Sequence, residues 1–473
     1  MTLSRYWHTL RYLRPVQFYG RLWFRLYRPR PDIRPAPGLR PATGSWMAAA
    51  AKPVSLLGPA TLRFLNQTHE VAGSGAWNDP ARDKLWLYNL HYFDDLGAAP
   101  SPQPSPAGGE GARAATGAAH ILPSPLRGGG VGGEGDEGPQ CAHSPSPLAG
   151  EGRGEGDGAP RCAPPPSPLA GEGWGEGVQA ASDQRLQWHL ALLTRWVAEN
   201  PPGTGTGWEP YPTSLRIVNW IKWALAYSPE REGVSAVLPP ACLQSLAVQA
   251  RWLSRRLEHH LLGNHLFANA KALVFAGAFF IGPEADRWRT LGLRLLAREL
   301  DEQILPDGGH FERSPLYHAI LLEDVLDLIN LAGAYPGLFA VAGTGAEVMD
   351  VTVAAVRVDA VTGTDAVAHW RATATAMLRW LAAMAHPDGE ISFFNDAAQG
   401  IAPPLAALVA YAERLGIAAE AAPPPSPCWL HASGYVRLEA GPAVALLDVA
   451  PIGPDYLPGH AHADTLSFEL SLF

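Results

Sequence analysis

Polar and charged side chains gather where one helix of the sequence should begin. Residues Ile304–Leu328 read ILPDGGHFERSPLYHAILLEDVLDL, in which a turn rich in glycine and charge leads into a helix predicted to start at Ser314-Pro315. The loop and the first helical turn contain His310, Glu312, Arg313, Tyr317 and His318. Helix N-termini attract anions because their N–H groups are unpaired and the dipole is positive there, and arginine binds carboxylates with two parallel hydrogen bonds. The pattern predicts a seat for an acidic ligand, although a single tyrosine on a helix is also common in a core.

A second polar stretch, LPGHAHADTLSFEL, lies close to the last residue of the sequence. His460 and His462 alternate on a predicted strand, so both should point to the same face, with Asp464 next along it. Such a set could hold a metal or perform acid–base chemistry. The alternative is a pair of ordinary surface histidines, because a complete metal site needs further ligands.

Two more stretches combine polar groups with aromatic rings. In WEPYPTSLRIVNW, Trp208 and Tyr211 precede a helix that carries Arg216, and stacking rings beside an arginine suit a charged sugar. The competing interpretation is an aromatic core with a surface arginine. In LEHHLLGNHLFANAKAL, the glycine breaks a helix and places Asn264 and His265 at the start of the next one, where asparagine could equally be a simple cap.

The elements that must position these residues are mostly helical. From 183 to 420, successive segments have apolar residues at three-to-four spacing, which favours an (α/α) helical toroid over a simple bundle. After Pro427 the period becomes two, and residues 433–441, 443–451 and 463–473 are predicted strands. We expect 428–473 to be the beginning of an antiparallel β-sandwich, apparently truncated.

The first part of the chain contains a basic helix and an unusual insertion. Residues 1–98 should hold an amphipathic N-terminal helix, in which arginines alternate with aromatic residues, and the first part of the helical domain. Membrane-surface binding and packing of the aromatic side on the main domain both fit this helix, and packing is favoured. Residues 99–182 are rich in Pro, Gly, Ser and Glu and repeat SPLAGEG, which predicts a disordered low-complexity insertion.

Composition limits the class of protein. The chain has 473 residues, 47% of them hydrophobic, and a net charge of −9, so it should be globular and should not bind nucleic acid as its main partner. The 4 cysteines are too scattered for a disulfide framework. No stretch predicts a transmembrane segment, and the N-terminus lacks the unbroken apolar core of a classical signal peptide.

Taken in order, the polar stretches resemble a known family. WEPYPTSLRIVNW, GNHLFANAKALVFAG, GGHFERSPLYHAILLEDVLDL and SGYVRLE followed by GHAHADTLSFEL are similar to blocks of the heparinase II/III family of polysaccharide lyases. The resemblance covers nearly all of the chain except 99–180. It implies a toroid followed by a β-sandwich, with the active site between them, and a substrate that is an acidic, uronic-acid-containing polysaccharide.

The reaction implied by the resemblance is β-elimination, in which the C5 proton of a uronate is removed and the oxygen at C4 leaves. The resemblance makes Asn264 and His265 the groups that neutralise the carboxylate, Tyr317 and His460 the acid–base pair, and His462 a ligand of a structural zinc. The partner ligands of that zinc would follow residue 473, so the site should be incomplete here. Substrate contacts are implied for Trp208, Tyr211, Arg216 and Arg313. The family also implies a periplasmic location.

Other functions remain open at this stage. The insertion, the short sandwich and the missing signal peptide all depart from the family pattern, so a non-catalytic glycan-binding or assembly component of exopolysaccharide biosynthesis or secretion is the alternative. A hydrolase would need two carboxylates that flank one bond. Candidates for such a pair are Glu312, Glu323, Asp388 and Asp396.

Overall fold

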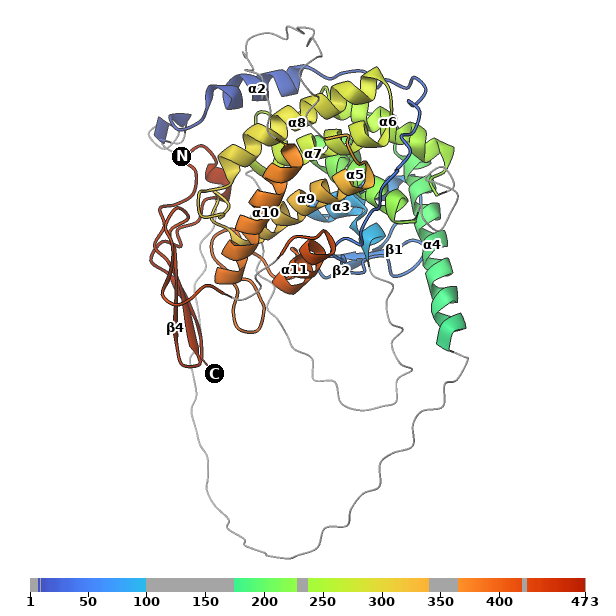
Figure 1. The fold of residues 1–473 in the computed structure, drawn as a ribbon. Coiled ribbons are helices and arrows are strands. Elements are labelled where there is room, and N and C mark those ends of the chain that lie inside the picture. The colour runs from blue at the N-terminus through green and yellow to red at the C-terminus, as the bar shows by residue number, and fades with distance from the viewer. Residues whose placement is uncertain are drawn as a thin grey trace, which may run out of the picture. The chain divides into compact units, whose positions relative to one another are not determined.

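Helices followed by a sheet make up the described part of the chain. The computed structural model describes residues 7–8, 10–98, 174–227, 237–339, 365–418 and 423–472. Within them, a helix-rich region precedes a C-terminal antiparallel sheet (Figure 1), which confirms the predicted order. The closed toroid and the two-layered sandwich stay predictions, because the described C-terminal strands form one sheet.

The helices agree with the predicted periodicity. Their bounds are α2 (Pro15–Leu26), α3 (Lys84–Tyr92), α4 (Trp174–Glu199), α5 (Pro210–Tyr227), α6 (Pro240–Leu253), α7 (Gly263–Phe279), α8 (Pro283–Gln303), α9 (Pro315–Ala334), α10 (Ala366–Ala383) and α11 (Leu405–Arg414). Helix α4 begins inside the segment predicted as an insertion, whose residues 99–173 lie outside the described part. Residues 1–101 and 181–473 belong to one compact unit, so the segments that flank the insertion pack together.

Helix α7 lies at the centre of this packing. It is apolar all round and almost entirely buried, as expected of a helix enclosed by others, and it contacts α5, α6, α8 and α9. The sequence predicted a helix that breaks at Gly263, but helix α6 ends at Leu253. Asn269 of α7 accepts a hydrogen bond from the N–H of Glu258 at 2.8 Å and holds the intervening chain in a loop. This loop leads directly into Asn264 and His265.

The N-terminal helix α2 is amphipathic, but it packs differently from the favoured prediction. It rests on the protein through Gln17, Gly20 and Phe24. Most of its large apolar side chains, including Leu22 and Trp23, are exposed. Among the described residues, no helix has both the length and the apolar character needed to cross a bilayer.

The described strands form two sheets. A small hairpin pairs β1 (Thr61–Phe64) with β2 (Gln67–Glu70). The larger sheet has the order β3 (Cys428–Leu430), β4 (Tyr435–Ala440), β5 (Ala443–Asp448) and β6 (Phe468–Ser471), all antiparallel. The predicted hairpin of β4 and β5 is confirmed, whereas β3 escaped prediction because its apolar run is only three residues long.

The predicted strand 463–473 is shorter than expected. Leu466 has φ +72° and its N–H binds the Asp448 carbonyl at 2.7 Å, so the chain turns there and β6 starts only at Phe468. His460 ends a short 3-10 helix, Pro458–His460, and His462 follows in an irregular segment. The prediction that His460, His462 and Asp464 share one face of a strand is therefore wrong.

The sheet is fastened to the helical region by buried hydrogen bonds. Arg437 of β4 donates to the carbonyls of Ala383 and Ala385 at the end of α10, at 3.1 and 2.6 Å. Trp380 of α10 donates its indole N–H to the Ser433 hydroxyl at 2.8 Å. These contacts fix the segment after β5, which carries His460, relative to the helices.

Candidate active site

Tyr317 lies in the first turn of α9, where the sequence predicts it. Ser314 caps this helix, and its hydroxyl accepts a hydrogen bond from the Tyr317 N–H at 3.3 Å, which confirms the predicted helix start. The same hydroxyl donates to the Asp396 carbonyl at 2.7 Å. The cap therefore ties the start of α9 to the segment that contains Asp396.

Three side chains from distant parts of the chain meet at this point. The rings of Tyr317 and His460 lie perpendicular, with centroids 5.1 Å apart. Nδ1 of His460 lies 2.8 Å from a carboxylate oxygen of Asp396, and the charge of the same carboxylate acts on the Tyr317 phenol. Because a carboxylate only accepts, Nδ1 of His460 carries the hydrogen and Nε2 is left as the basic atom. We call Tyr317, His460 and Asp396 the tyrosine cluster.

The electrostatics separate the roles of the two titrating groups. Burial, and next the charge of Asp396, raises the pKa of Tyr317 far above its ordinary value, so the phenol keeps its proton. Burial alone would lower the pKa of His460, but the hydrogen bond to Asp396 and the charge of Glu312 outweigh it and raise that pKa above 6.5. The tyrosine cluster thus places a phenol that stays protonated, Tyr317, beside an imidazole with a raised pKa, His460.

A second group of polar side chains forms around the start of α7. The ring centroids of Tyr211 and of His265, the residue that follows Asn264, lie 4.5 Å apart. Leu262, with φ +66°, occupies the N-cap position, so the interpretation of Asn264 as a cap is wrong. Nδ1 of His265 lies 3.3 Å from the Glu258 carboxylate, an ion-pair distance when the histidine is protonated. We call Tyr211, Asn264 and His265 the amide cluster.

Glu312 lies between the two clusters. It is 4% exposed, and its Oε2 lies 3.9 Å from Nδ1 of His460 without a hydrogen-bond partner among the described residues. Its Oε1 would be 3.2 Å from a Cβ on Gly263, the residue before Asn264. Burial raises the pKa of Glu312, and His460 and His265 both oppose that shift. The buried carboxyl group of Glu312 therefore interacts electrostatically with His460 of the tyrosine cluster and with His265 of the amide cluster.

Other predicted contact residues lie outside this arrangement. Trp208 is 3% exposed and packs against Trp196 and Trp252. Arg216 is 0% exposed, with its guanidinium 3.8 Å from the centre of the Trp196 ring and bonded to Gln249. Side chains without accessible surface cannot touch a polysaccharide, so these two predicted contacts are corrected to core residues.

Arg313 is used at the junction between helices and sheet. Its Nε donates to the Ser433 carbonyl at 3.1 Å, and its own carbonyl accepts from Tyr435 and Asn395. These bonds account for its conformation, with φ +58°. The structure thus gives Arg313 a supporting role beside the tyrosine cluster.

The remaining polar residues of the same loop are also structural. His310 is buried, with Nε2 3.3 Å from Gln303, and His318 stacks on Trp380. Of the carboxylates considered for hydrolysis, Glu312 and Asp396 lie at the site. Glu323 is paired with Lys52, and Asp388 accepts a turn hydrogen bond from Glu390.

The described residues do not provide a ligand set for the predicted zinc. Nε2 of His462 lies 3.7 Å from Asp396, but the described residues contain no group of three or more His, Cys, Asp or Glu side chains that could hold a metal ion. The residues present do not fit a zinc site, so no chemistry is derived from one.

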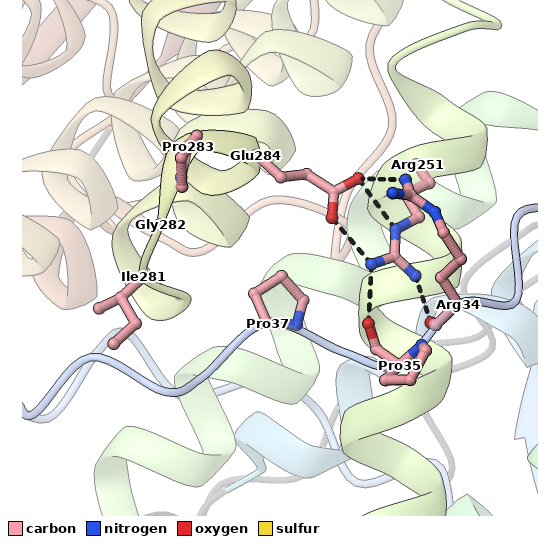
Figure 2. A pocket seen from close by; sticks show the side chains of 8 residues that line it. All are labelled: Arg34, Pro35, Pro37, Arg251, Ile281, Gly282, Pro283 and Glu284. Atoms are coloured by element: carbon pink, nitrogen blue, oxygen red, sulfur yellow. Dashed lines mark hydrogen bonds and ion pairs between the residues drawn. The ribbon is translucent and has the colours of Figure 1, made fainter.

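A pocket elsewhere on the surface belongs to the scaffold. Figure 2 shows its lining, which comes from the N-terminal segment, α6 and the start of α8: Arg34, Pro35, Pro37, Arg251, Ile281, Gly282, Pro283 and Glu284. Its buried Arg251 donates to Glu284 and to the carbonyls of Arg34 and Pro35. The donors are used to hold the N-terminal segment in place, and none of the predicted site residues lines this pocket.

The sequence pointed to Tyr317 and His460, which lie together in the structure, but it did not reveal the carboxylates beside them. Asp396 and Glu312 entered only as carboxylates for a hydrolase, and Glu258 was not considered. Asp396 is 64 positions from its partner His460, and no periodicity relates the two. A search for carboxylates near histidines would have produced many equal candidates.

Comparison with known proteins supports the resemblance. The description "Heparinase II/III N-terminus" matches residues 176–337, and "Heparinase II/III-like, C-terminal" matches residues 422–472. A heparin-sulfate lyase of Bacteroides stercoris is 39% identical over 74 residues, which are 15% of this chain and 11% of that protein. One of Bacteroides thetaiotaomicron is 29% identical over 162 residues, 33% of this chain and 22% of that protein.

A solved structure titled "Crystal Structure of Heparinase III" is also similar, with a TM-score of 0.45, 20% identity, and coverage of 62% of this chain and 47% of that one. The chain therefore matches less than half the length of these relatives. The N-terminal and C-terminal family descriptions match in the same order in which the helices and the sheet follow each other. Residues 176–337 and 422–472 of the chain are thus similar to the two parts of the heparinase II/III family.

Proposed function

We propose that this protein is a polysaccharide lyase that cleaves a uronic-acid-containing polysaccharide by β-elimination. The observation that carries the proposal is the joining of the tyrosine cluster and the amide cluster by Glu312. The heparin-sulfate lyases to which the chain is similar support the same class of reaction.

The first requirement of the reaction is a neutralised uronate. The C5 proton is too weakly acidic unless the neighbouring carboxylate can carry the developing enolate charge. In our proposal the amide of Asn264 and the ring of His265 bind that carboxylate, and the ring of Tyr211 packs against His265. Hydrogen-bond donors that are fixed before the reaction need no reorganisation while charge develops.

The second requirement is a base at C5 and an acid at O4. Nε2 of neutral His460 takes the C5 proton, the electron pair forms the double bond between C4 and C5, and the bond from C4 to its oxygen breaks. The phenol of Tyr317, which its raised pKa keeps protonated, gives its proton to the leaving oxygen. Asp396 keeps the hydrogen on Nδ1 of His460 throughout. At the end of the cycle, solvent water removes the proton from Nε2 and protonates the Tyr317 phenolate, so both groups regain their starting states.

The experiment that tests this function is ultraviolet absorbance of the unsaturated uronate during incubation with heparan, alginate, hyaluronan and bacterial exopolysaccharides. Tyr317→Phe should lower kcat by a factor of roughly 10² to 10⁴ while ligand affinity is kept. Tyr335→Phe is the matched control, because Tyr335 is buried and its hydroxyl has no hydrogen-bond partner among the described residues.

The other functions predict different results. Binding without any absorbance change, with a folded protein, would favour the non-catalytic glycan-binding or assembly role in exopolysaccharide biosynthesis or secretion. Cleavage without an unsaturated product would favour hydrolysis by the carboxyl groups of Glu312 and Asp396. We also propose the periplasm as the compartment, on the resemblance alone, and cell fractionation of the tagged native protein tests it.

A further inference from the structure

Helix α2 divides its surface into three parts. With about 100° of rotation per residue, Gln17, Gly20 and Phe24 share the face that rests on the protein. The opposite face carries Tyr19, Leu22, Trp23 and Leu26, and the arc between the two carries Arg14, Arg21 and Arg25. A helix that only served as packing would turn its apolar side inward.

The inward face is held firmly, so the orientation of α2 is fixed. Gln17 donates to the Tyr456 carbonyl at 2.9 Å, and a Cβ on Gly20 would come within 3.0 Å of His260. The guanidinium of Arg256 lies 3.6 Å from the centre of the Phe24 ring and donates to the Phe24 carbonyl. Arg14 forms an ion pair with Glu302 of α8, beside which α2 lies in Figure 1.

The outward face exposes an apolar surface of unusual composition. Tyr19 is 62% exposed, Leu22 60%, Trp23 62% and Leu26 72%. We call these four residues the α2 apolar face. The Trp23 ring stacks on Tyr27 at 4.8 Å. Tryptophan and tyrosine mixed with leucine are typical of helices that lie in the interface of a bilayer, where the rings occupy the headgroup level.

The charge around this face has one sign. Arginines occupy positions 5, 11, 14, 21, 25, 28 and 30, and the first acidic residue is Asp32, although the whole chain carries −9. Arg21, Arg25, Arg28 and Arg30 form no hydrogen bond or ion pair with another described side chain. Unpaired guanidinium groups beside an apolar face are complementary to anionic headgroups above acyl chains.

We propose that α2 is a peripheral membrane-binding site that takes the surface of a bilayer containing anionic phospholipids. The α2 apolar face enters the headgroup boundary, and Arg21 and Arg25 bind lipid phosphates beside it. At 12 residues the helix is far shorter than the roughly 20 that cross a bilayer, so it lies in the plane of the surface. A soluble acidic polymer would leave the exposed leucines without a partner, which is why a lipid surface is favoured.

The test is co-sedimentation of the full chain with vesicles of phosphatidylcholine alone and of equal parts phosphatidylcholine and phosphatidylglycerol. Binding is expected only with the anionic vesicles and should weaken at high salt. Leu22→Ser combined with Trp23→Ser, and separately Arg21→Gln combined with Arg25→Gln, should each weaken binding roughly tenfold or more. Trp429→Ser, at a 56% exposed tryptophan of β3, is the matched control and should bind like the unaltered chain.

Three outcomes would overturn the proposal. Binding to both kinds of vesicle alike, or equal binding by all variants, would remove the role of this face and its arginines. Retention on immobilised heparin without vesicle binding would assign the arginines to an acidic polymer. Concentration-dependent dimers in sedimentation velocity, lost in the Leu22→Ser and Trp23→Ser double variant and accompanied by no vesicle binding, would assign the face to a second copy of the chain.

Discussion

In the proposed mechanism, Asp396 sets the basicity of His460 because it is the hydrogen-bond partner of Nδ1 of that residue. His460 must be neutral to take a proton, so kcat/KM should rise with pH through its pKa, which lies above 6.5. Asp396→Asn removes a negative charge and therefore lowers the pKa of His460. We expect the acidic limb of the kcat/KM profile to move to lower pH, with a lower maximal rate.

A matched substitution separates this effect from a general loss of structure. Asp388→Asn changes a carboxylate in an exposed turn and should leave the profile in place. No alkaline limb is expected near neutral pH in any of these proteins, because burial and Asp396 hold the pKa of Tyr317 far above 10. If the acidic limb of the kcat/KM profile stays at the same pH in Asp396→Asn while the rate falls, Asp396 acts only by positioning His460.

The same scale shows what residue patterns can and cannot reveal. The position of Tyr317 in the first turn of its helix was predictable because Ser314 and Pro315 mark the helix start, whereas its role was implied only by the family resemblance. Trp208 and Arg216 have the residue types of a sugar-binding surface, yet both are buried in the core. An arginine that stacks on a tryptophan ring has the same sequence pattern whether the pair is buried or exposed. Burial depends on which helices surround a position, and local spacing does not contain that information.

Among the helices, α9 is anchored by a buried charge. Asp327 accepts hydrogen bonds from Lys222 of α5, Lys271 of α7 and the Tyr411 hydroxyl of α11. Burial opposes the charged form, but the two ammonium groups outweigh it, so the pKa of Asp327 is lowered. Removal of one member of a buried ion pair leaves uncompensated charge and costs about 3–5 kcal/mol.

We therefore expect Asp327→Ala to lower the free energy of unfolding by about that amount, measured by urea denaturation monitored through helical circular dichroism. Asp301→Ala in α8, whose side chain is 78% exposed, should change it by less than about 0.5 kcal/mol. Equal stability of the two variants would mean that this network contributes no net stabilisation to the packing of α5, α7, α9 and α11.

Element boundaries were predicted less well than element types. Helical periodicity identified α4 to α9, and alternation identified β4 and β5. The predicted end of α6 and the predicted start of β6 were wrong because residues distant in sequence determine them. Asn269 accepts a hydrogen bond from the loop after α6, and the Asp448 carbonyl accepts one from the turn before β6. The strand therefore starts only after that second turn, and His460 lies before it, at the end of the 3-10 helix Pro458–His460.

At the scale of the molecule, the order of helices and then strands could be predicted, whereas the contacts that join them could not. Tyr317 belongs to the helical region, and His460 follows the strands of the sheet, so the tyrosine cluster exists only while the two parts remain together. One of the contacts that join them is the single hydrogen bond from Trp380 to Ser433, which lie 53 positions apart in the sequence. Nothing in either local sequence marks the other as its partner.

Arg437 offers a test of whether helices and sheet unfold as one unit. It is buried in β4 and donates to two carbonyls at the end of α10, so Arg437→Met keeps much of its volume but leaves both acceptors unpaired. If the parts are cooperative, amide hydrogen exchange should accelerate together in β4, in the end of α10 and in residues 456–462, and the proposed lyase activity should fall with it. Arg294→Met, at an exposed position of α8, is the control, because Arg294 donates only to the Thr290 carbonyl of its own helix. Amide exchange in all three segments should remain as slow as in the unaltered chain. Faster exchange confined to β4 would instead mean that the sheet opens independently. His460 would then be positioned without the sheet, by the hydrogen bond from Gln17 of α2 to the Tyr456 carbonyl and by its own contact with Asp396.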